Sequence, residues 1–192
     1  TKSNPASRHL LAAAPKAAAR RCLEAGFDFV EIHAGHGYLI ETFLTPFYNR
    51  RDDEYGGSFE NRIRFLLEVL REVKNRTEGR IPVGVRLNAE DFLPEGSWGM
   101  EDLLRLAPIL EEEGAAYLHI SCGTSTYGTL APMIAPMYLE QGARVGYAAA
   151  VKKVVSIPVI AVGRIKDPAM ADAIIREGKA DLVAMGRAFL AD

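Results

Sequence analysis

An α/β fold built around a parallel sheet is the fold class that the 192-residue sequence predicts, and two patterns support it. Short runs rich in Val, Ile and Leu alternate with longer segments of helical period, which is the order typical of βα units. These runs are apolar at consecutive positions instead of alternate ones, as expected of strands that are buried on both faces. The predicted strands are FDFVEIH at 27–33, IPVGVRL at 81–87, AYLHIS at 116–121, IPVIAV at 157–162 and ADLVAM at 180–185.

The segments that flank these strands carry helix signals. Apolar residues recur three and four positions apart, so each helix would have one face that packs on the sheet. Glycine follows the end of three of these segments, as is common after a helix C-terminus. The expected helices are 16–24, 60–76, 100–113, 144–155 and 168–177. No linker or low-complexity segment interrupts the pattern, so we expect a single domain.

Composition excludes several classes of protein. Hydrophobic residues make up 48% and charged residues 25%, and 23 Lys and Arg stand against 25 Asp and Glu, a net charge of -2. Without a basic excess, neither a nucleic-acid partner nor an anionic membrane is expected. The two cysteines lack the spacing of a zinc site or a disulfide framework. With no apolar run near the ~20 residues of a membrane span and no signal-peptide pattern, a cytoplasmic protein is expected.

The number of strands leaves two architectures open. A closed (β/α)8 barrel typically needs about 250 residues, so five βα units fit an open doubly wound sheet or a barrel without its first three units. No GxGxxG follows any predicted strand, which counts against a dinucleotide-binding sheet. Gly-Arg pairs instead follow the last two strands, where barrels commonly bind a phosphate. The sequence therefore favours an incomplete (β/α)8 TIM barrel with about five βα units, corresponding to strands 4 to 8.

Three side chains that can exchange protons come directly after the first predicted strand, in HAGHGY at 33–38. Barrel active sites lie at that end of the strands. Two histidines and a tyrosine among glycines, which let a ligand approach the backbone, favour a catalytic role for His33, His36 and Tyr38. Two alternatives remain open. The histidines could bind zinc, although no acidic third ligand is evident, or they could serve as acid and base in a phosphate-binding lyase or isomerase.

The stretch VEIHAGHGYLIETFLTPFYNRRDDEYGGSFENRIRF at 30–65 resembles the signature of the old yellow enzyme family of FMN-dependent NADH:flavin oxidoreductases. VGVRLN, IPVIAVGRIKDP and ADLVAMGRAFLAD also resemble that family's fifth, seventh and eighth strands, in the same order. The resemblance implies FMN as cofactor, NAD(P)H as electron donor and an activated alkene (an enone, enoate or enoyl-CoA) as small-molecule substrate. It is nearest to the dienoyl-CoA reductase and enoate reductase subgroup, whose iron-sulfur cluster would lie in a segment downstream of Asp192.

The resemblance also implies the roles of the residues after the first strand. His33 and His36 match the pair that hydrogen-bonds the carbonyl or nitro oxygen of the substrate, and Tyr38 matches the tyrosine that delivers a proton. Such a pair would withdraw electron density from the C=C bond while the phenol protonates the α carbon.

Five further positions match the family's contacts to FMN. Arg86 would face the pyrimidine edge of the flavin, although a salt bridge to a neighbouring carboxylate remains an alternative. The phosphate would bind at Gly163, Arg164, Gly186 and Arg187.

The charged segment before the second predicted helix is expected to have a structural role. Arg51, Asp53 and Glu60 would pair among themselves, and Ser58 would cap the helix that follows. His119, inside the third predicted strand, is expected to be a satisfied histidine of the core or of the barrel interior.

The family's first three strands have no counterpart before the first predicted strand. Residues 1–192 are therefore expected to form a single partial TIM-barrel domain that binds FMN. An open barrel would expose apolar interior surface and strand edges, which predicts a homo-oligomer or a missing barrel segment as partner. The alternative is a non-catalytic fragment that cannot hold FMN alone.

Overall fold

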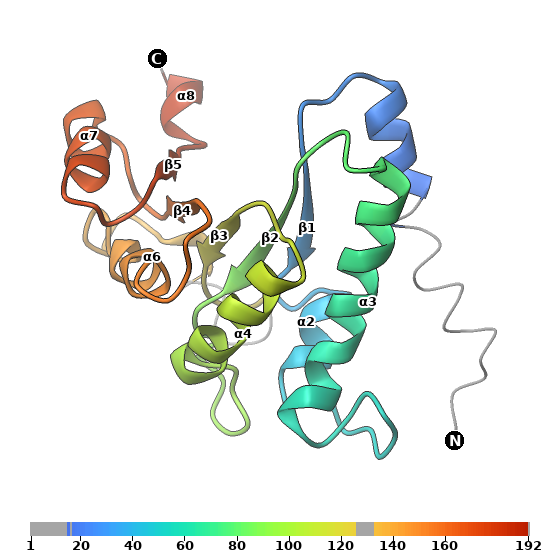
Figure 1. Ribbon diagram of the computed structural model, residues 1–192. Helices are drawn as coiled ribbons and strands as arrows, with labels where there is room; N and C mark the ends of the chain where they lie inside the picture. The colour runs from blue at the N-terminus through green and yellow to red at the C-terminus, as the bar shows by residue number, and fades with distance from the viewer. Residues whose placement is uncertain (1–14, 16, 126–132, 192) are drawn as a thin grey trace.

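The computed structural model describes residues 15, 17–125 and 133–191. Its centre is a parallel sheet with the strand order β1-β2-β3-β4-β5, so each strand pairs with the next one along the chain (Figure 1). This sequential order lacks the reversal that characterises a doubly wound sheet. The strands are β1 Val30–Ala34, β2 Val83–Asn88, β3 Leu118–Ser121, β4 Val159–Val162 and β5 Leu182–Ala184.

The strands start two or three residues later than predicted. In β2 and β4 the reason is local, because Pro82 and Pro158 have no N–H group to donate to the ladder and pairing begins at the following valine. The types and order of all five strands are as predicted.

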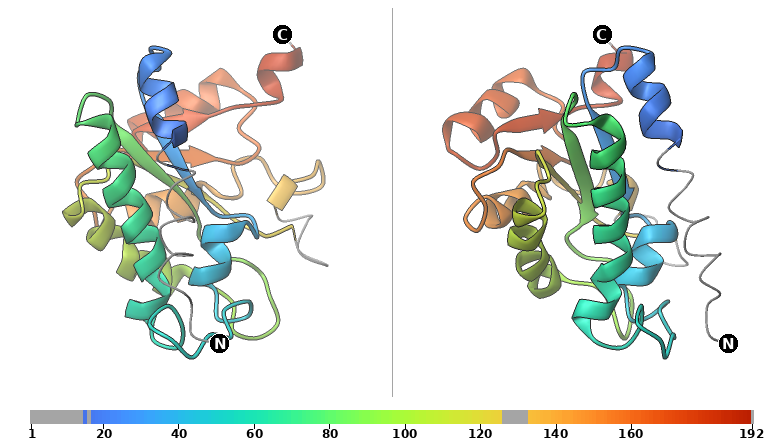
Figure 2. Two further views of the ribbon diagram at one scale, coloured as in Figure 1. Left: turned by 90° about the vertical axis from the view of Figure 1, so that its right-hand side faces the viewer. Right: turned by 45° about the vertical axis from the view of Figure 1, so that its right-hand side comes forward.

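Helices connect the strands along one side of the sheet, as Figures 1 and 2 show. Residues 17–24 are helical, and α3 packs on β2, α6 on β3 and β4, and α7 on β5. Two short helices, α2 and α8, were not predicted. The helices are α2 Leu39–Leu44, α3 Phe59–Thr77, α4 Met100–Glu112, α6 Val145–Val151, α7 Pro168–Arg176 and α8 Ala188–Ala191.

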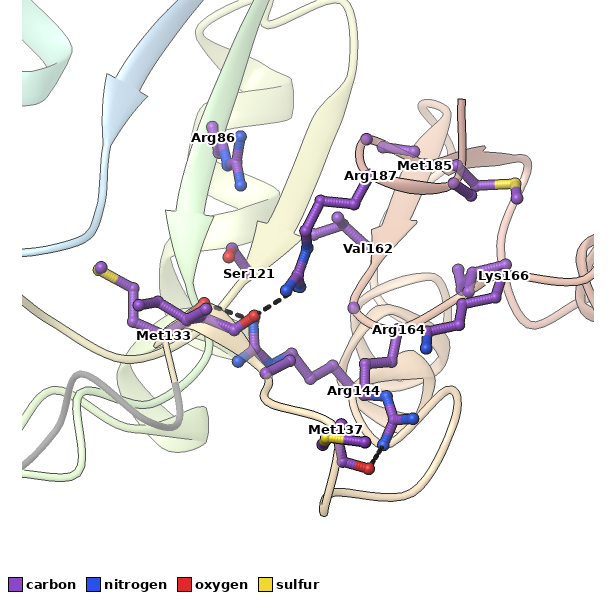
Figure 3. A pocket seen from close by; sticks show the side chains of 17 residues that line it. Arg86, Ser121, Met133, Met137, Arg144, Val162, Arg164, Lys166, Met185 and Arg187 are labelled. Carbon is purple, nitrogen blue, oxygen red and sulfur yellow. Dashed lines mark hydrogen bonds between the residues drawn. The ribbon is translucent and has the colours of Figure 1, made fainter. Parts of the chain in front are cut away.

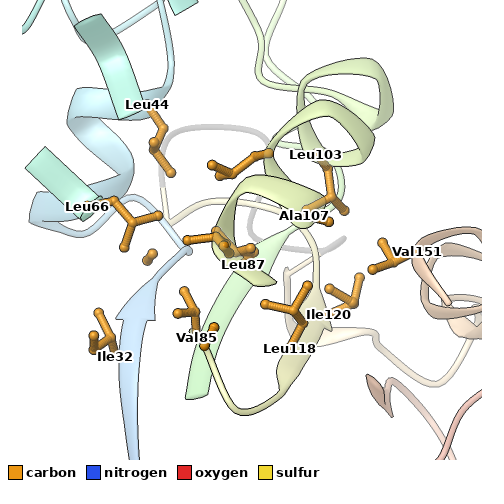
Figure 4. Packing of buried hydrophobic residues seen from close by; sticks show 14 of the residues in the cluster. Ile32, Leu44, Leu66, Val85, Leu87, Leu103, Ala107, Leu118, Ile120 and Val151 are labelled. Atoms are coloured by element: carbon orange, nitrogen blue, oxygen red, sulfur yellow. The ribbon is translucent and has the colours of Figure 1, made fainter. Parts of the chain in front are cut away.

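Strand register divides the sheet into two chemically different faces, since side chains alternate along each strand. One face meets the helices and forms the apolar core that Figure 4 shows, with Ile32, Val85 and Leu118 in register across three strands. The prediction of burial on both faces is confirmed for β3, where all four residues are buried, and is wrong for the outer strands β1 and β5, whose opposite face is open in the described residues. There Phe29 is 58% exposed and Leu182 50% exposed, because no described element covers this side.

The charged segment before α3 is structural, as predicted, with one correction. Arg51 pairs with Asp53, at 2.9 Å between Nε and Oδ1, and Ser58 caps α3 by accepting from the Asn61 N–H. Glu60 does not join them. It lies on the exposed side of the first turn of α3 and pairs across to Arg105 on α4.

His119 is only partly satisfied, which corrects the prediction. Its Nδ1 lies 3.0 Å from the Glu31 carboxylate on β1, but its Nε2 is buried without a hydrogen bond. Over the described ranges, no helix is long and apolar enough to cross a membrane.

Candidate active site

The loop after β1 brings the three predicted catalytic side chains together. The His33 ring lies 5.0 Å from the His36 ring and 5.3 Å from the Tyr38 ring, measured between centroids. The chain turns sharply here because His36 and Gly37 both have positive φ angles, of 63° and 84°. Tyr38 is 58% exposed, so its hydroxyl is accessible from outside the fold.

Burial disfavours the protonated form of both histidines. It is the main cause that lowers the pKa of His36 to about 3, and the nearby positive charge of Arg86 adds to the effect. The pKa of His33 is also lowered, by burial first and Arg86 second. Neutral imidazoles can each offer one N–H to a ligand oxygen.

Ser121, at the end of β3, fixes the orientation of His36. Its hydroxyl lies 2.7 Å from His36 Nε2, and an isolated bridge between His36 and Thr124 joins the loops after β1 and β3. The sequence analysis did not identify Ser121, because the two partners are 85 positions apart.

Beside this loop, a cavity of about 670 Å³ opens at the carboxyl ends of β2 to β5 (Figure 3). It contains every predicted cofactor-binding residue, and none of the described residues that line it is a carboxylate. The polar and glycine residues that line it are Arg86, Ser121, Arg144, Gly163, Arg164, Lys166, Gly186 and Arg187.

Arg86 projects from β2 between two histidines, since it is in register with His33 on β1 and His119 on β3. Its Nε is buried and makes no hydrogen bond. Burial lowers the pKa of Arg86, and the attraction of Glu31 only partly opposes the effect. The alternative of a salt bridge to a carboxylate is not realised among the described residues.

Three arginines of the cavity hold the segment 133–137, which lies across its mouth. Arg144 Nη1 donates to the Met133 carbonyl at 3.0 Å and Arg187 Nη2 to the Ile134 carbonyl at 2.8 Å, as Figure 3 shows, while Arg164 donates to the Met137 carbonyl. Arg144 is only 6% exposed, and its other terminal nitrogen, Nη2, is buried without a partner.

Arg144 was missed by the sequence analysis, which treated its position as an ordinary helix start. Its stem lies against Gly163, where a Cβ atom would come within 2.7 Å of Arg144 Cδ. Gly163 therefore makes room for Arg144, and its φ of 128° also disfavours other residues.

A buried polar cluster lies behind the catalytic loop and was also not predicted. Glu41 on α2 accepts from the Gly37 N–H and, at 2.7 Å, from the Asn88 amide. The same amide donates to Asp91 at 2.9 Å, and Asp91 accepts from the Thr45 hydroxyl at 2.6 Å. Burial, together with Asp91, raises the pKa of Glu41 well above its ordinary value.

The geometry does not support the alternative of a zinc site at these histidines. Within the part of the chain that the structure describes, no three His, Cys, Asp or Glu side chains gather as metal ligands would.

A parallel α/β sheet with a basic cavity at the carboxyl ends of its strands is the arrangement of enzymes that bind phosphate-bearing ligands at that end. The chain belongs to the NADH:flavin oxidoreductase / NADH oxidase family, whose model matches residues 13–192. This match confirms the resemblance to FMN-dependent oxidoreductases of the old yellow enzyme type.

Individual relatives agree with the family assignment. The chain is 46% identical over 175 residues to an NADH oxidase of Thermoanaerobacter brockii, a match that covers 91% of this chain and 26% of that protein. It is 38% identical over 183 residues to a cinnamate reductase of Clostridium sporogenes, covering 88% and 27%. A solved complex of 2-naphthoyl-CoA reductase with 2-naphthoyl-CoA superposes with a TM-score of 0.90 at 29% identity, covering 100% of this chain and 29% of that one.

The chain spans between about a quarter and a half of the length of the curated relatives that it matches. The fold and the basic cavity therefore belong to a segment that corresponds to only part of each of these relatives.

Proposed function

We propose that the intact protein reduces activated C=C bonds, in enones, enoates or enoyl-CoA thioesters, with FMN as cofactor and NAD(P)H as electron donor. The observation that carries this proposal is the meeting of His33, His36 and Tyr38 beside the half-buried Arg86, whose buried Nε has no hydrogen-bond partner. A cinnamate reductase and a naphthoyl-CoA reductase among the relatives support substrates whose C=C bonds are activated by a carbonyl.

The residues of the cavity fit FMN. A phosphate group carries up to two negative charges and prefers guanidinium groups and backbone amides, which Gly163-Arg164 and Gly186-Arg187 would supply. Arg86, with an orphaned buried Nε, would face the pyrimidine edge and stabilise negative charge there. The described lining residues include four arginines and a lysine and no carboxylate, which favours an anionic ligand.

When bound, FMN supplies hydride transfer, and the protein supplies orientation, electrostatics and a proton. His33 and His36 would each donate an N–H to the carbonyl oxygen of the substrate and so withdraw electron density from the C=C bond. Ser121 would donate to His36 Nε2, which places the ring proton on Nδ1. Tyr38 would protonate the α carbon from its exposed position.

We also propose that residues 1–192 form five βα units of one FMN-binding barrel domain. The remainder of the barrel would cover the open sheet face, where Phe29 and Leu182 are exposed and Glu31, His33 and His119 are grouped. Without such cover, this face would favour self-association.

Stopped-flow kinetics of the two half-reactions test the function. Tyr38→Phe should slow alkene reduction by roughly 10²-fold or more, the usual effect of losing a positioned general acid, and leave flavin reduction by NAD(P)H unchanged. Tyr55→Phe is the matched control, because it removes a phenol that bonds Glu68 away from this loop. Equal slowing of both half-reactions by Tyr38→Phe would remove Tyr38 from the role of proton donor.

A further inference from the structure

The carboxyl groups of Glu41 and Asp91 share one buried amide partner. Asn88 Nδ2 donates to Glu41 Oε1 at 2.7 Å and to Asp91 Oδ1 at 2.9 Å, which places the two carboxyl groups side by side. Glu41 is 1% exposed and Asp91 is fully buried. The pair lies between α2 and the loop after β2, behind the catalytic loop.

No positive charge compensates this pair. Neither carboxyl forms an ion pair within the described residues, and the hydrogen-bond partners of Glu41 there are the Asn88 amide and the backbone amide of Gly37. Burial and the mutual repulsion of two adjacent carboxylates both favour the neutral form of one of them, so the pair is expected to hold one proton.

Glu41 connects this pair to the catalytic loop. Its Oε2 accepts from the N–H of Gly37, the residue between His36 and Tyr38. The loop there has a left-handed conformation at His36, which costs free energy for a residue with a side chain and persists only when the surroundings hold it. No side chain caps α2 at Tyr38, so the Glu41 carboxyl is the side-chain partner that the start of α2 has.

We propose that Glu41 is a positioning residue whose carboxyl, protonated toward Asp91, holds the Gly37 amide and thereby sets His36 and Tyr38 in their working orientation. Asp91 acts as the acceptor that orients the proton, and Asn88, which donates to both acids, holds them next to each other. The effect on catalysis rests on the proposed function, whereas the proton shared by Glu41 and Asp91 and the hydrogen bond to Gly37 do not.

Infrared spectroscopy tests the shared proton without any cofactor or substrate. At pH 7 the intact protein should show the C=O stretching band of a protonated carboxylic acid, and Glu41→Gln should remove it. Glu72→Gln is the matched control and should leave the band in place, because Glu72 is a half-buried carboxylate whose charge is paired with Arg76 on α3. A band that is absent from the wild type, or that survives in Glu41→Gln, would overturn the shared proton.

Hydrogen exchange tests the hydrogen bond between the Gly37 N–H and Glu41. Glu41→Ala should speed exchange of the amides in residues 36–38 by about tenfold or more, because it removes the buried carboxyl that accepts from the Gly37 N–H. Glu41→Gln should keep exchange within about threefold of wild type, because the amide still offers an acceptor and a donor. If the alanine variant does not fold, Glu41→Asp, one methylene too short to reach Gly37, replaces it.

The two half-reactions then separate positioning from mere stability. Glu41→Ala should slow alkene reduction by about 10²-fold through misplacement of His36 and Tyr38, leave flavin reduction unchanged, and be rescued by Glu41→Gln. Equal slowing of both half-reactions, or no rescue by Gln, would refute the positioning role. Failure of the proposed function would show differently, as an inactive wild type that still has the infrared band and the protected amide.

Discussion

Replacement of Arg86 by Met should make the ligand-free protein more stable and destroy its affinity for FMN. Arg86 is partly buried on β2, its Nε has no partner, and burial outweighs the attraction of Glu31 in lowering its pKa. Burial of a charge without a full set of partners lowers the free energy of unfolding, because the lost hydration is not replaced. An apolar side chain of similar size removes this desolvation cost. Met fills the same space without a charge.

The magnitude follows from how much of the guanidinium is desolvated. Replacing a fully buried ionic group gains up to about 4 kcal/mol, and partial exposure of Arg86 reduces this to about 1 to 2 kcal/mol. For a chain of this size each kcal/mol shifts Tm by roughly 2 to 4 °C. FMN at about 100 times its Kd would stabilise the wild type by about 2.7 kcal/mol. The wild type should therefore have the higher Tm when FMN is present, and Arg86→Met the higher Tm when it is absent.

Thermal unfolding followed by circular dichroism, with and without FMN, measures both effects. Arg76→Met is the control, since Arg76 is an exposed residue of α3 that pairs with Glu72 at 3.8 Å. It should leave both Tm values within the range of ordinary surface substitutions. The reasoning is refuted if Arg86→Met lowers the Tm of the ligand-free protein, or if FMN raises the Tm of this variant as much as that of the wild type.

Three further predictions concern stability. Leu66→Ala, at a fully buried position of α3, should cost about 2 to 5 kcal/mol in urea unfolding, and a loss below about 1 kcal/mol would contradict the packing in Figure 4. Ser58→Ala should cost about 1 kcal/mol in the same assay through loss of the α3 cap, and Ser58→Asp should restore it. Unfolded His36 binds a proton below pH 6.5 whereas folded His36 does so only near pH 3, so stability should fall as the pH falls through this window. His36→Asn should flatten that part of the urea-midpoint profile, and an unchanged slope would show that burial does not hold His36 neutral.

The elements that the sequence predicted are those whose signal is local. Consecutive apolar residues identify β1 to β5, and helical spacing identifies α3 and α4 to within one residue at each end. The short α2 and α8 have four to six residues and too few internal bonds to form alone. Burial of Ile40 and Leu44 against α3 stabilises α2, a tertiary effect that no local pattern encodes.

In the candidate site too, residues that are close in the sequence could be predicted and residues that meet only in the fold could not. His33, His36 and Tyr38 are neighbours in the sequence, so their meeting was predictable. Ser121 reaches His36 from a different strand, and Glu41 and Asp91 meet across 50 positions of sequence only because α2 folds back over the end of β2. These partners become identifiable once the register of the strands is known.

The measurement that tests the central claim most directly compares FMN with riboflavin, which lacks the phosphate. Flavin fluorescence titrations of the intact protein give the Kd of each ligand for the wild type and for Arg187→Ala. Because Arg187 lies at the end of β5 in the basic cavity, the variant should weaken FMN binding by about tenfold or more and leave riboflavin binding unchanged. Equal losses for both flavins, or no loss for FMN, would contradict the assignment of this cavity to the phosphate of FMN.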